Sequence, residues 1–95
     1  MNSENVKVLL IEDNPEHAAF LRHLLNLSDT SDFQLEHVET LALGLERLKQ
    51  RDIGLILLDL SLGDSDGLET FILTMAAAED VAIVVMSGSS ITCKV

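Results

Sequence analysis

The chain has few aromatic residues, a single cysteine and no long apolar run, and each shortage excludes something. Aromatic residues make up 3% of the 95 residues, so a core must be built from Leu, Val, Ile and Ala. Cys93 is the only cysteine, which rules out an internal disulfide and favours a reducing compartment. No apolar run approaches the roughly 20 residues that span a bilayer, and residues 1–6 lack a signal-peptide pattern. We therefore expect a cytoplasmic protein without a membrane segment.

Basic residues are also scarce. Six Lys and Arg stand against 16 Asp and Glu, which gives a formal net charge of −10 and a pI of about 4.4. Such a surface repels a phosphate backbone, so nucleic acid is not an expected partner. The acidity either serves solubility alone or includes carboxylates clustered around a cation. The length fits one domain, residues 1–95, and 47% apolar residues supply its core.

Strand-like and helix-like segments alternate along the chain. Nearly continuous apolar runs predict buried strands, and alternation predicts a shorter one; the expected strands are 6–11, 33–38, 55–58 and 81–86. Asn14 with Pro15 predicts one helix start and Thr40 another. The expected apolar helix faces are Ala18, Leu21, Leu24 and Leu25; Leu41, Leu45 and Leu48; and Leu68, Ile72, Met75 and Ala76. This order predicts an α/β fold with a parallel sheet and helices on both faces.

Polar side chains stand where three of these strands end. Ligands of open parallel sheets bind at the carboxyl ends of the strands. Glu12 and Asp13 follow the first strand, Asp59 follows the third, and Ser87 follows the fourth. Each alone is an ordinary loop or cap residue, but together they place three carboxylates and a hydroxyl at one edge. Carboxylate oxygens suit Mg²⁺, which usually bridges to phosphate, so one carboxylate is expected to attack a phosphoryl group and form an acyl phosphate.

Three motifs resemble those of receiver domains in two-component signalling: IEDNP (11–15), LILLDLSLGDSDGLE (55–69) and VVMSG (84–88). The resemblance implies a flavodoxin-like (CheY-like) fold with strand order 2-1-3-4-5. It implies that Asp59 is the phospho-acceptor, that Asp13 and Asp59 coordinate Mg²⁺, and that Glu12 holds the ion through water. The backbone carbonyl of Ser61 looks like a further ligand, and Ser87 matches the family's switch hydroxyl. The implied partner is a histidine kinase or histidine phosphotransfer protein, and the chain is expected to accept a phosphoryl group, not to act as an enzyme.

The chain departs from the family pattern after residue 90. Four strands and three helices are expected, so we expect a domain truncated after the fourth strand, with the last βα unit missing. Family members carry a Lys after the fifth strand, and Lys94 comes too soon after Ser87 to be that residue. Strand 81–86 is then expected at an open sheet edge, beside an exposed apolar patch. Such an edge predicts a homodimer or a domain-swapped oligomer.

Two other functions compete with the phospho-acceptor hypothesis. The first is a non-signalling assembly module, a degenerate receiver that dimerises through its exposed sheet edge. The second is a phosphohydrolase with an Asp nucleophile of the haloacid-dehalogenase type. Such enzymes usually carry a second Asp two positions after the first, and Ser61 occupies that position here.

Overall fold

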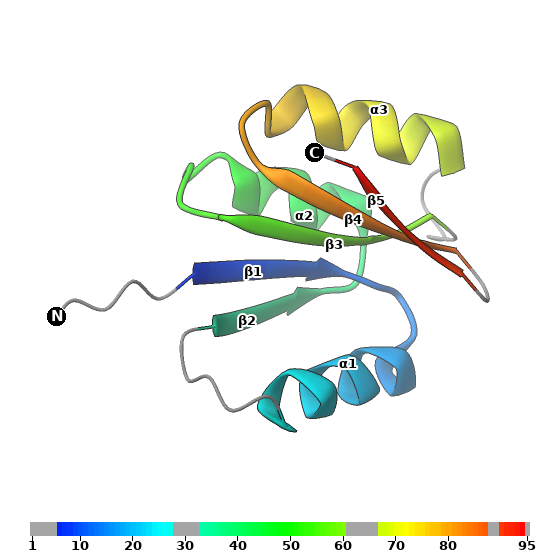
Figure 1. Ribbon diagram of the computed structural model, residues 1–95. Helices are drawn as coiled ribbons and strands as arrows, with labels where there is room; N and C mark the ends of the chain where they lie inside the picture. Colours follow the sequence, from blue (N-terminus) through cyan, green and yellow to red (C-terminus); the bar gives the residue numbers. More distant parts are fainter. Residues whose placement is uncertain (1–5, 28–32, 61–66, 88–89, 95) are drawn as a thin grey trace, which may run out of the picture.

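A computed structural model describes residues 6–27, 33–60, 67–87 and 90–94 of the chain. The elements are β1 (Val6–Ile11), α1 (Pro15–Leu27), β2 (Phe33–Val38), α2 (Leu41–Leu48), β3 (Leu55–Asp59), α3 (Gly67–Ala77), β4 (Ala82–Ser87) and β5 (Ser90–Lys94). One five-stranded sheet has the order β2-β1-β3-β4-β5. Helix α1 lies on one side of the sheet, and α2 and α3 lie on the other (Figure 1). Among the described residues, no helix combines the length and apolar character needed to cross a membrane.

The parallel part of the sheet confirms the predicted architecture. Strand β1 is parallel to both β2 and β3, and β3 is parallel to β4. The strand order 2-1-3-4 and the three helices are those that the flavodoxin-like resemblance implies. The central strand β1 is buried on both faces from Val8 to Ile11, as its uninterrupted apolar run predicted.

The expected open edge on the fourth strand is wrong. Strand β5 pairs antiparallel with β4, with Ser87 opposite Ser90 and Ile83 opposite Lys94. Backbone groups of β4 therefore bond to β3 on one side and β5 on the other. The sheet edge shifts to β5, and the structural reason for dimerisation through β4 disappears.

The main core lies between the sheet and the α2–α3 layer. Thr40 caps α2 by accepting a hydrogen bond from the Leu43 N–H at 3.1 Å, as predicted. Leu41 and Leu48 then turn inward. A Cβ on Gly44 would lie 2.5 Å from Ile11 Cδ1, so glycine allows α2 to approach β1 closely. The buried core residues are Leu9, Ile11, Leu41, Leu48, Ile53, Ile56, Leu58, Ala78 and Ile83.

Helix α3 is rotated relative to its predicted face. Leu68, Ile72 and Met75 were expected inside, but they are 72%, 51% and 40% exposed, and Ala76 is exposed as well. Thr70 and Thr74 are fully buried in their place. The Thr74 hydroxyl donates to the Thr70 carbonyl at 2.7 Å, which satisfies a buried polar group within the helix. The helix therefore presents an apolar stripe to solvent.

Helix α1 begins as predicted. The Asn14 side chain accepts hydrogen bonds from the N–H groups of Glu16 (2.8 Å) and His17 (3.3 Å), and Pro15 occupies the first helical position. Ala18 is buried against the sheet, whereas Leu24, expected inside, is 45% exposed. Leu25 lies outside the described side chains.

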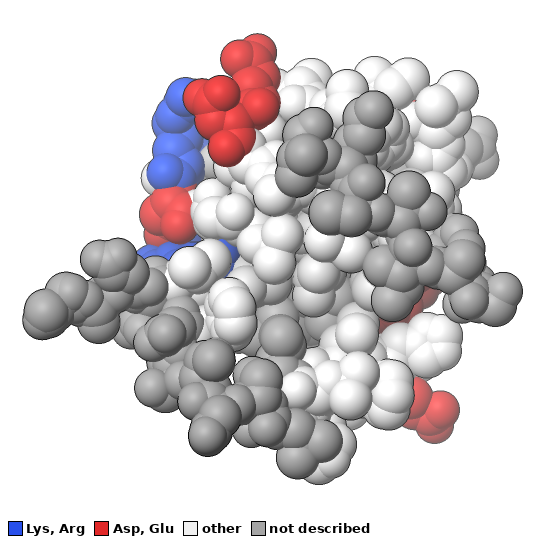
Figure 2. Space-filling model, in the orientation of Figure 1, with Lys and Arg blue, Asp and Glu red and all other residues white. Residues whose placement is uncertain are grey.

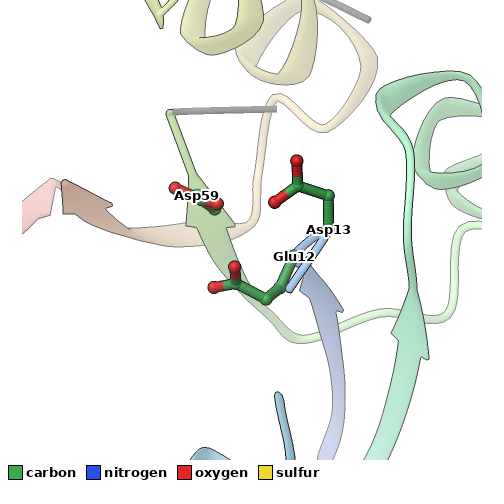
Figure 3. Close-up of side chains that lie close together, drawn as sticks. All are labelled: Glu12, Asp13 and Asp59. Carbon is green, nitrogen blue, oxygen red and sulfur yellow. The ribbon is translucent and has the colours of Figure 1, made fainter. Parts of the chain in front are cut away.

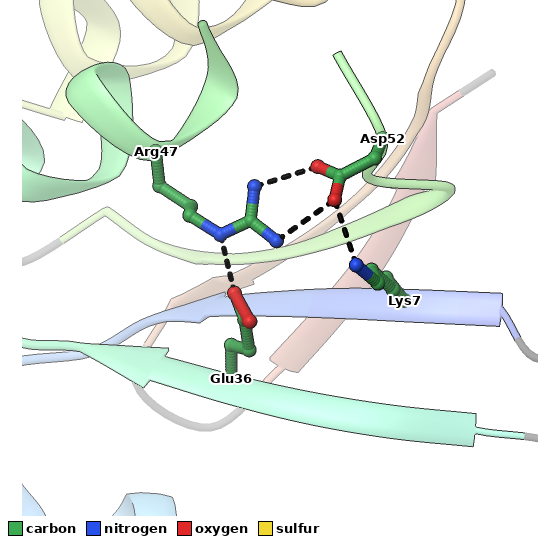
Figure 4. A network of polar contacts seen from close by, with 4 residues as sticks. All are labelled: Lys7, Glu36, Arg47 and Asp52. Atoms are coloured by element: carbon green, nitrogen blue, oxygen red, sulfur yellow. Dashed lines mark hydrogen bonds and ion pairs between the residues drawn. The ribbon is translucent and has the colours of Figure 1, made fainter. Parts of the chain in front are cut away.

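An ion network joins α2 to the sheet at the end where the parallel strands begin (Figure 4). The Arg47 guanidinium contacts Glu36 on β2 and donates two hydrogen bonds to Asp52, at 2.6 and 3.2 Å. Lys7 on β1 donates to the same Asp52 carboxylate at 2.8 Å. The hydrogen bonds from Arg47 and then Lys7 hold the pKa of Asp52 well below its usual range. The network lies at the opposite end of the sheet from the predicted site.

Candidate functional site

The carboxyl ends of β1 and β3 bring three predicted site residues together. Ile11 pairs in register with Leu58, so the residues that follow each strand lie side by side. Oxygen atoms of Glu12, Asp13 and Asp59 all lie within 4.8 Å of one another. Figure 3 shows the three side chains at the ends of the two strands. The structure thus confirms that these carboxylates converge, as the strand order predicted.

Glu12 is held in place by contacts with three residues, two of which belong to β2. Its N–H donates to the Val38 carbonyl at 3.0 Å, which extends the pairing of β1 with β2 by one residue. Its side chain accepts from the Asn14 N–H at 3.2 Å. Nε2 of His37 lies 2.7 Å from the Glu12 carbonyl oxygen, and this contact requires a proton on that nitrogen because a carbonyl only accepts. The carboxylate is therefore positioned before any ligand arrives.

In the protein alone, the charged form of the Glu12 carboxylate is energetically unfavourable. The residue is only 3% exposed, and this burial is the largest cause that raises the pKa of Glu12 above 4.5. A hydrogen bond with Asp59 and the Asp59 charge raise it further, whereas the Asn14 N–H and the charge of His17 lower it. His17 Nδ1 lies 3.6 Å from the carboxylate and its side chain is 66% exposed. Together these effects raise the pKa of Glu12, so a bound cation would stabilise its charged form.

The three carboxylates differ in their access to solvent. Asp59 is 8% exposed, whereas Asp13 is an exposed residue. A ligand can therefore approach from the Asp13 side and reach Asp59, while Glu12 forms the buried wall. Asp59 ends β3 and is anchored by its backbone, which pairs with Met86 of β4.

The residues present fit a hard divalent cation. Three carboxylates supply oxygen donors only, and Mg²⁺ prefers such ligands together with water and phosphate oxygens. Burial, more than the neighbouring Asp59, raises the pKa of Glu12, and a bound cation would offset the cost of keeping this carboxylate charged. Asp13 and Asp59 would hold the ion, with Glu12 behind them.

Two predicted site residues fall outside what the structure describes. Ser61, predicted to offer a backbone carbonyl, lies outside the described residues. Ser87 ends β4 at the same sheet edge as Asp59, but its side chain lies outside the described ones. Lys94 pairs with Ile83, four residues before Ser87. At a rise of about 3.3 Å per residue its backbone lies roughly 13 Å from that end of the strand, which agrees with the expectation that Lys94 is not the family's lysine.

Sequence reasoning did not connect the histidines with the site. All three were interpreted as ordinary surface or boundary residues. His17 is exposed, but its Nδ1 lies 3.6 Å from the Glu12 carboxylate. His37 is half-buried and bonds to the Glu12 backbone. The signal was available in the strand order, because the last residues of β2 must lie beside the end of β1.

Comparison with known proteins agrees with this geometry. The family model of the response regulator receiver domain matches residues 8–93. The acid tolerance regulatory protein ActR of Sinorhizobium medicae is 33% identical over 82 residues, which cover 86% of this chain and 41% of that protein. The chain thus spans less than half the length of this curated relative.

Solved structures show the same fold. A sensor protein from Polaromonas sp. JS666 superposes with a TM-score of 0.76 and 29% identity, covering 88% of this chain and 66% of the other. The MaeR response regulator bound to beryllium trifluoride gives a TM-score of 0.77 at 26% identity, covering 90% and 69%.

Proposed function

The chain belongs to the response regulator receiver family, and on that premise we propose that it accepts a phosphoryl group on Asp59 with the help of Mg²⁺. The observation that carries the proposal is the convergence of Glu12, Asp13 and Asp59 within 4.8 Å at the carboxyl edge of a parallel sheet. Within the described residues, no other group of three or more metal-binding side chains comes together in this way.

The proposed reaction is a phosphoryl transfer onto a carboxylate. An Asp59 oxygen attacks phosphorus, the new O–P bond forms an acyl phosphate, and the P–N bond of a phosphohistidine breaks. The leaving imidazole keeps the bonding electron pair and takes up a proton. Bound Mg²⁺ would supply positive charge that offsets the carboxylates and the phosphoryl oxygens. The backbone of β3 holds Asp59, and Asp13 lies on the open side where a donor must approach.

The proposed donor is a histidine kinase or a histidine phosphotransfer protein. The chain is the acceptor in this reaction and is not itself an enzyme. The Ser87 hydroxyl is proposed to bond a phosphoryl oxygen, and the Ser61 carbonyl to add a ligand to Mg²⁺. Both roles rest on the family resemblance and on the positions of the two residues in the sequence.

The assembly-module alternative is not favoured. It required an open edge on β4, and β5 covers that edge. The convergence of three carboxylates, one fully desolvated, is costly to folding and has no purpose in a module that only associates.

Intact-protein mass spectrometry tests the proposed function. The chain is incubated with phosphoramidate, whose P–N bond resembles that of phosphohistidine, with Mg²⁺ or with a chelator. We expect one added phosphoryl group in the presence of Mg²⁺, and none in Asp59→Asn. Asp52→Asn is the matched control, because Asp52 precedes β3 and Asp59 ends it, so the two carboxylates lie at opposite ends of that strand. Equal labelling of the parent and Asp59→Asn, or labelling that is independent of Mg²⁺, would contradict the proposal.

A further inference from the structure

The outward face of α3 is apolar in a way that folding does not require. Leu68, Ile72 and Met75 are spaced four and three residues apart and form one stripe along the helix. Leu73, 39% exposed, lies beside this stripe. The same helix buries Thr70 and Thr74, so its larger apolar side chains lie outside and its threonines inside. Burial in the core therefore does not explain these side chains, and adjacent apolar residues on a surface mark an interaction site.

A hollow lies at the carboxyl end of this stripe. It has a volume of about 370 Å³, and Ala76 and Ala77 continue into it from α3. Leu48, Ile53 and Val81 supply apolar walls, and Arg51, Glu79 and Asp80 supply charged ones. The volume is within the range of sites that bury an organic group, so the hollow is large enough to receive one side chain from a partner docked along α3.

Acidic residues predominate around this surface, although Arg51 also lines the hollow. From Asp52 to Cys93 the chain contains seven acidic residues and no Lys, Arg or His; the acids are Asp52, Asp59, Asp64, Asp66, Glu69, Glu79 and Asp80. Glu69, Glu79 and Asp80 are exposed and form no ion pair within the described part of the chain. Figure 2 shows acidic and basic side chains side by side at the upper left of the molecule and further acidic atoms at the lower right.

This charge pattern selects the occupant. In a parallel pair of two copies, Glu79 and Asp80 of one copy would meet the same residues of the other. In an antiparallel pair, the acidic residues Glu79 and Asp80 that follow α3 would meet Glu69 in its first turn. Both arrangements place like charges together in a chain of net charge −10, which disfavours a second copy. A partner with an apolar stripe and flanking Lys or Arg would cover the apolar face of α3 and would also pair with the acidic residues.

We propose that the stripe Leu68–Ile72–Met75 and the adjoining hollow form a docking site for a basic amphipathic helix of another protein. The stripe spans seven residue steps, about 10 Å at the helical rise, which matches two turns of a helix with apolar residues at i, i+4 and i+7. One apolar side chain of that helix enters the hollow, and its basic residues face Glu79 and Asp80. The site is separate from the phospho-acceptor site and does not depend on its chemistry.

A pair of synthetic peptides tests this docking site. Both form the same Leu-striped helix, one flanked by Lys and the other by Glu, and binding is followed by fluorescence anisotropy. We expect the Lys peptide to bind at least about tenfold more tightly than the Glu peptide. Ile72→Asp should weaken its binding about tenfold. Phe20→Asp, which changes an exposed apolar residue on α1, should alter binding less than about twofold.

A second variant separates charge from apolar contact. The double change Glu79→Gln and Asp80→Asn leaves the stripe intact and should weaken the Lys peptide about threefold and flatten its salt dependence. Equal binding of the two peptides, or no effect of Ile72→Asp, would overturn the proposal. So would self-association of the parent chain, measured by sedimentation, that Ile72→Asp abolishes, because the occupant would then be a second copy.

Discussion

Glu12 carries an energetic cost in the protein without a cation. Burial, and then the hydrogen bond and charge of Asp59, raise the pKa of Glu12 above 4.5. The folded state therefore binds a proton more tightly here than the unfolded state does. Stability from this group is present below about pH 4.5 and is lost as the pH rises toward the raised pKa of the folded state.

Replacing Glu12 should remove this loss. We expect Glu12→Gln to be more stable than the parent near neutral pH in the presence of a chelator, with the difference shrinking as the pH falls from the raised pKa toward 4.5. Urea unfolding at a series of pH values measures it. Glu16→Gln, a change at an exposed acid in the first turn of α1, is the control and should follow the parent curve. A Glu12→Gln advantage that grows as the pH falls would contradict this account.

The acidic residues of the site could be predicted because strand ends fix their positions. Glu12, Asp13 and Asp59 follow apolar runs that only fit buried parallel strands, and such strands end at a common edge. The contact of His37 with Glu12 was not predicted, because the alternating pattern of β2 does not say which residue of β1 lies beside His37. Neighbours across a sheet depend on register, which local sequence does not specify.

Helix α3 shows where helical periodicity alone is insufficient. Apolar residues occupy several of its sides, so more than one face satisfies the same spacing. The choice between faces is made by packing against the sheet, where Thr70, Thr74 and Ala78 allow close approach and Phe71 fills the remaining space. Strand β5 was missed for a different reason. In the sequence, Gly88–Ser89 separates two runs by two residues, which is a hairpin pattern, but the expectation of four strands left residues 90–94 without an element.

The orientation of α3 predicts opposite responses from two similar changes. Thr74→Val replaces a buried hydroxyl by a methyl group of the same shape, so we expect stability to stay level or rise by up to about 1 kcal/mol. Ile72→Thr changes an exposed residue and should alter stability by less than about 0.5 kcal/mol. Chemical denaturation of both variants measures these effects. A loss of more than 1 kcal/mol in Ile72→Thr would mean that Ile72 faces the core.

The ion network fastens α2 to the sheet and should matter more than an isolated surface pair. Arg47 contacts Glu36 and Asp52 from a side chain that is 14% exposed, so its removal takes this partner from Glu36 and leaves Asp52 with Lys7 alone. We expect Arg47→Met to lower stability by about 1 kcal/mol. Lys49→Met removes only the exposed pair with Glu46 and should cost a few tenths of a kcal/mol. Equal costs in thermal unfolding would show that the network adds nothing.

The fold as a unit is under electrostatic strain that a bound cation should relieve. A net charge of −10 on 95 residues opposes compaction, and the site concentrates three of these charges where β1 and β3 end. An ion that binds only the folded chain adds stability by mass action, about 1.4 kcal/mol at ten times its Kd. For a domain of this size, that corresponds to a rise in Tm of roughly 5–10 °C.

Mg²⁺ should therefore raise the Tm of the parent by this amount. NaCl of equal ionic strength should raise the Tm less, because Na⁺ screens all charges alike and does not bind specifically to the three carboxylates. Asp13→Asn should lose most of the Mg²⁺ effect, since it removes an exposed ligand without disturbing the core. Glu16→Gln also removes one negative charge, but just outside the cluster, and should keep the Mg²⁺ effect. Scanning calorimetry of the parent and the two variants distinguishes cation binding at the site from general screening. If Asp13→Asn and Glu16→Gln respond alike, general screening accounts for the stabilisation, and the three carboxylates do not form a cation site.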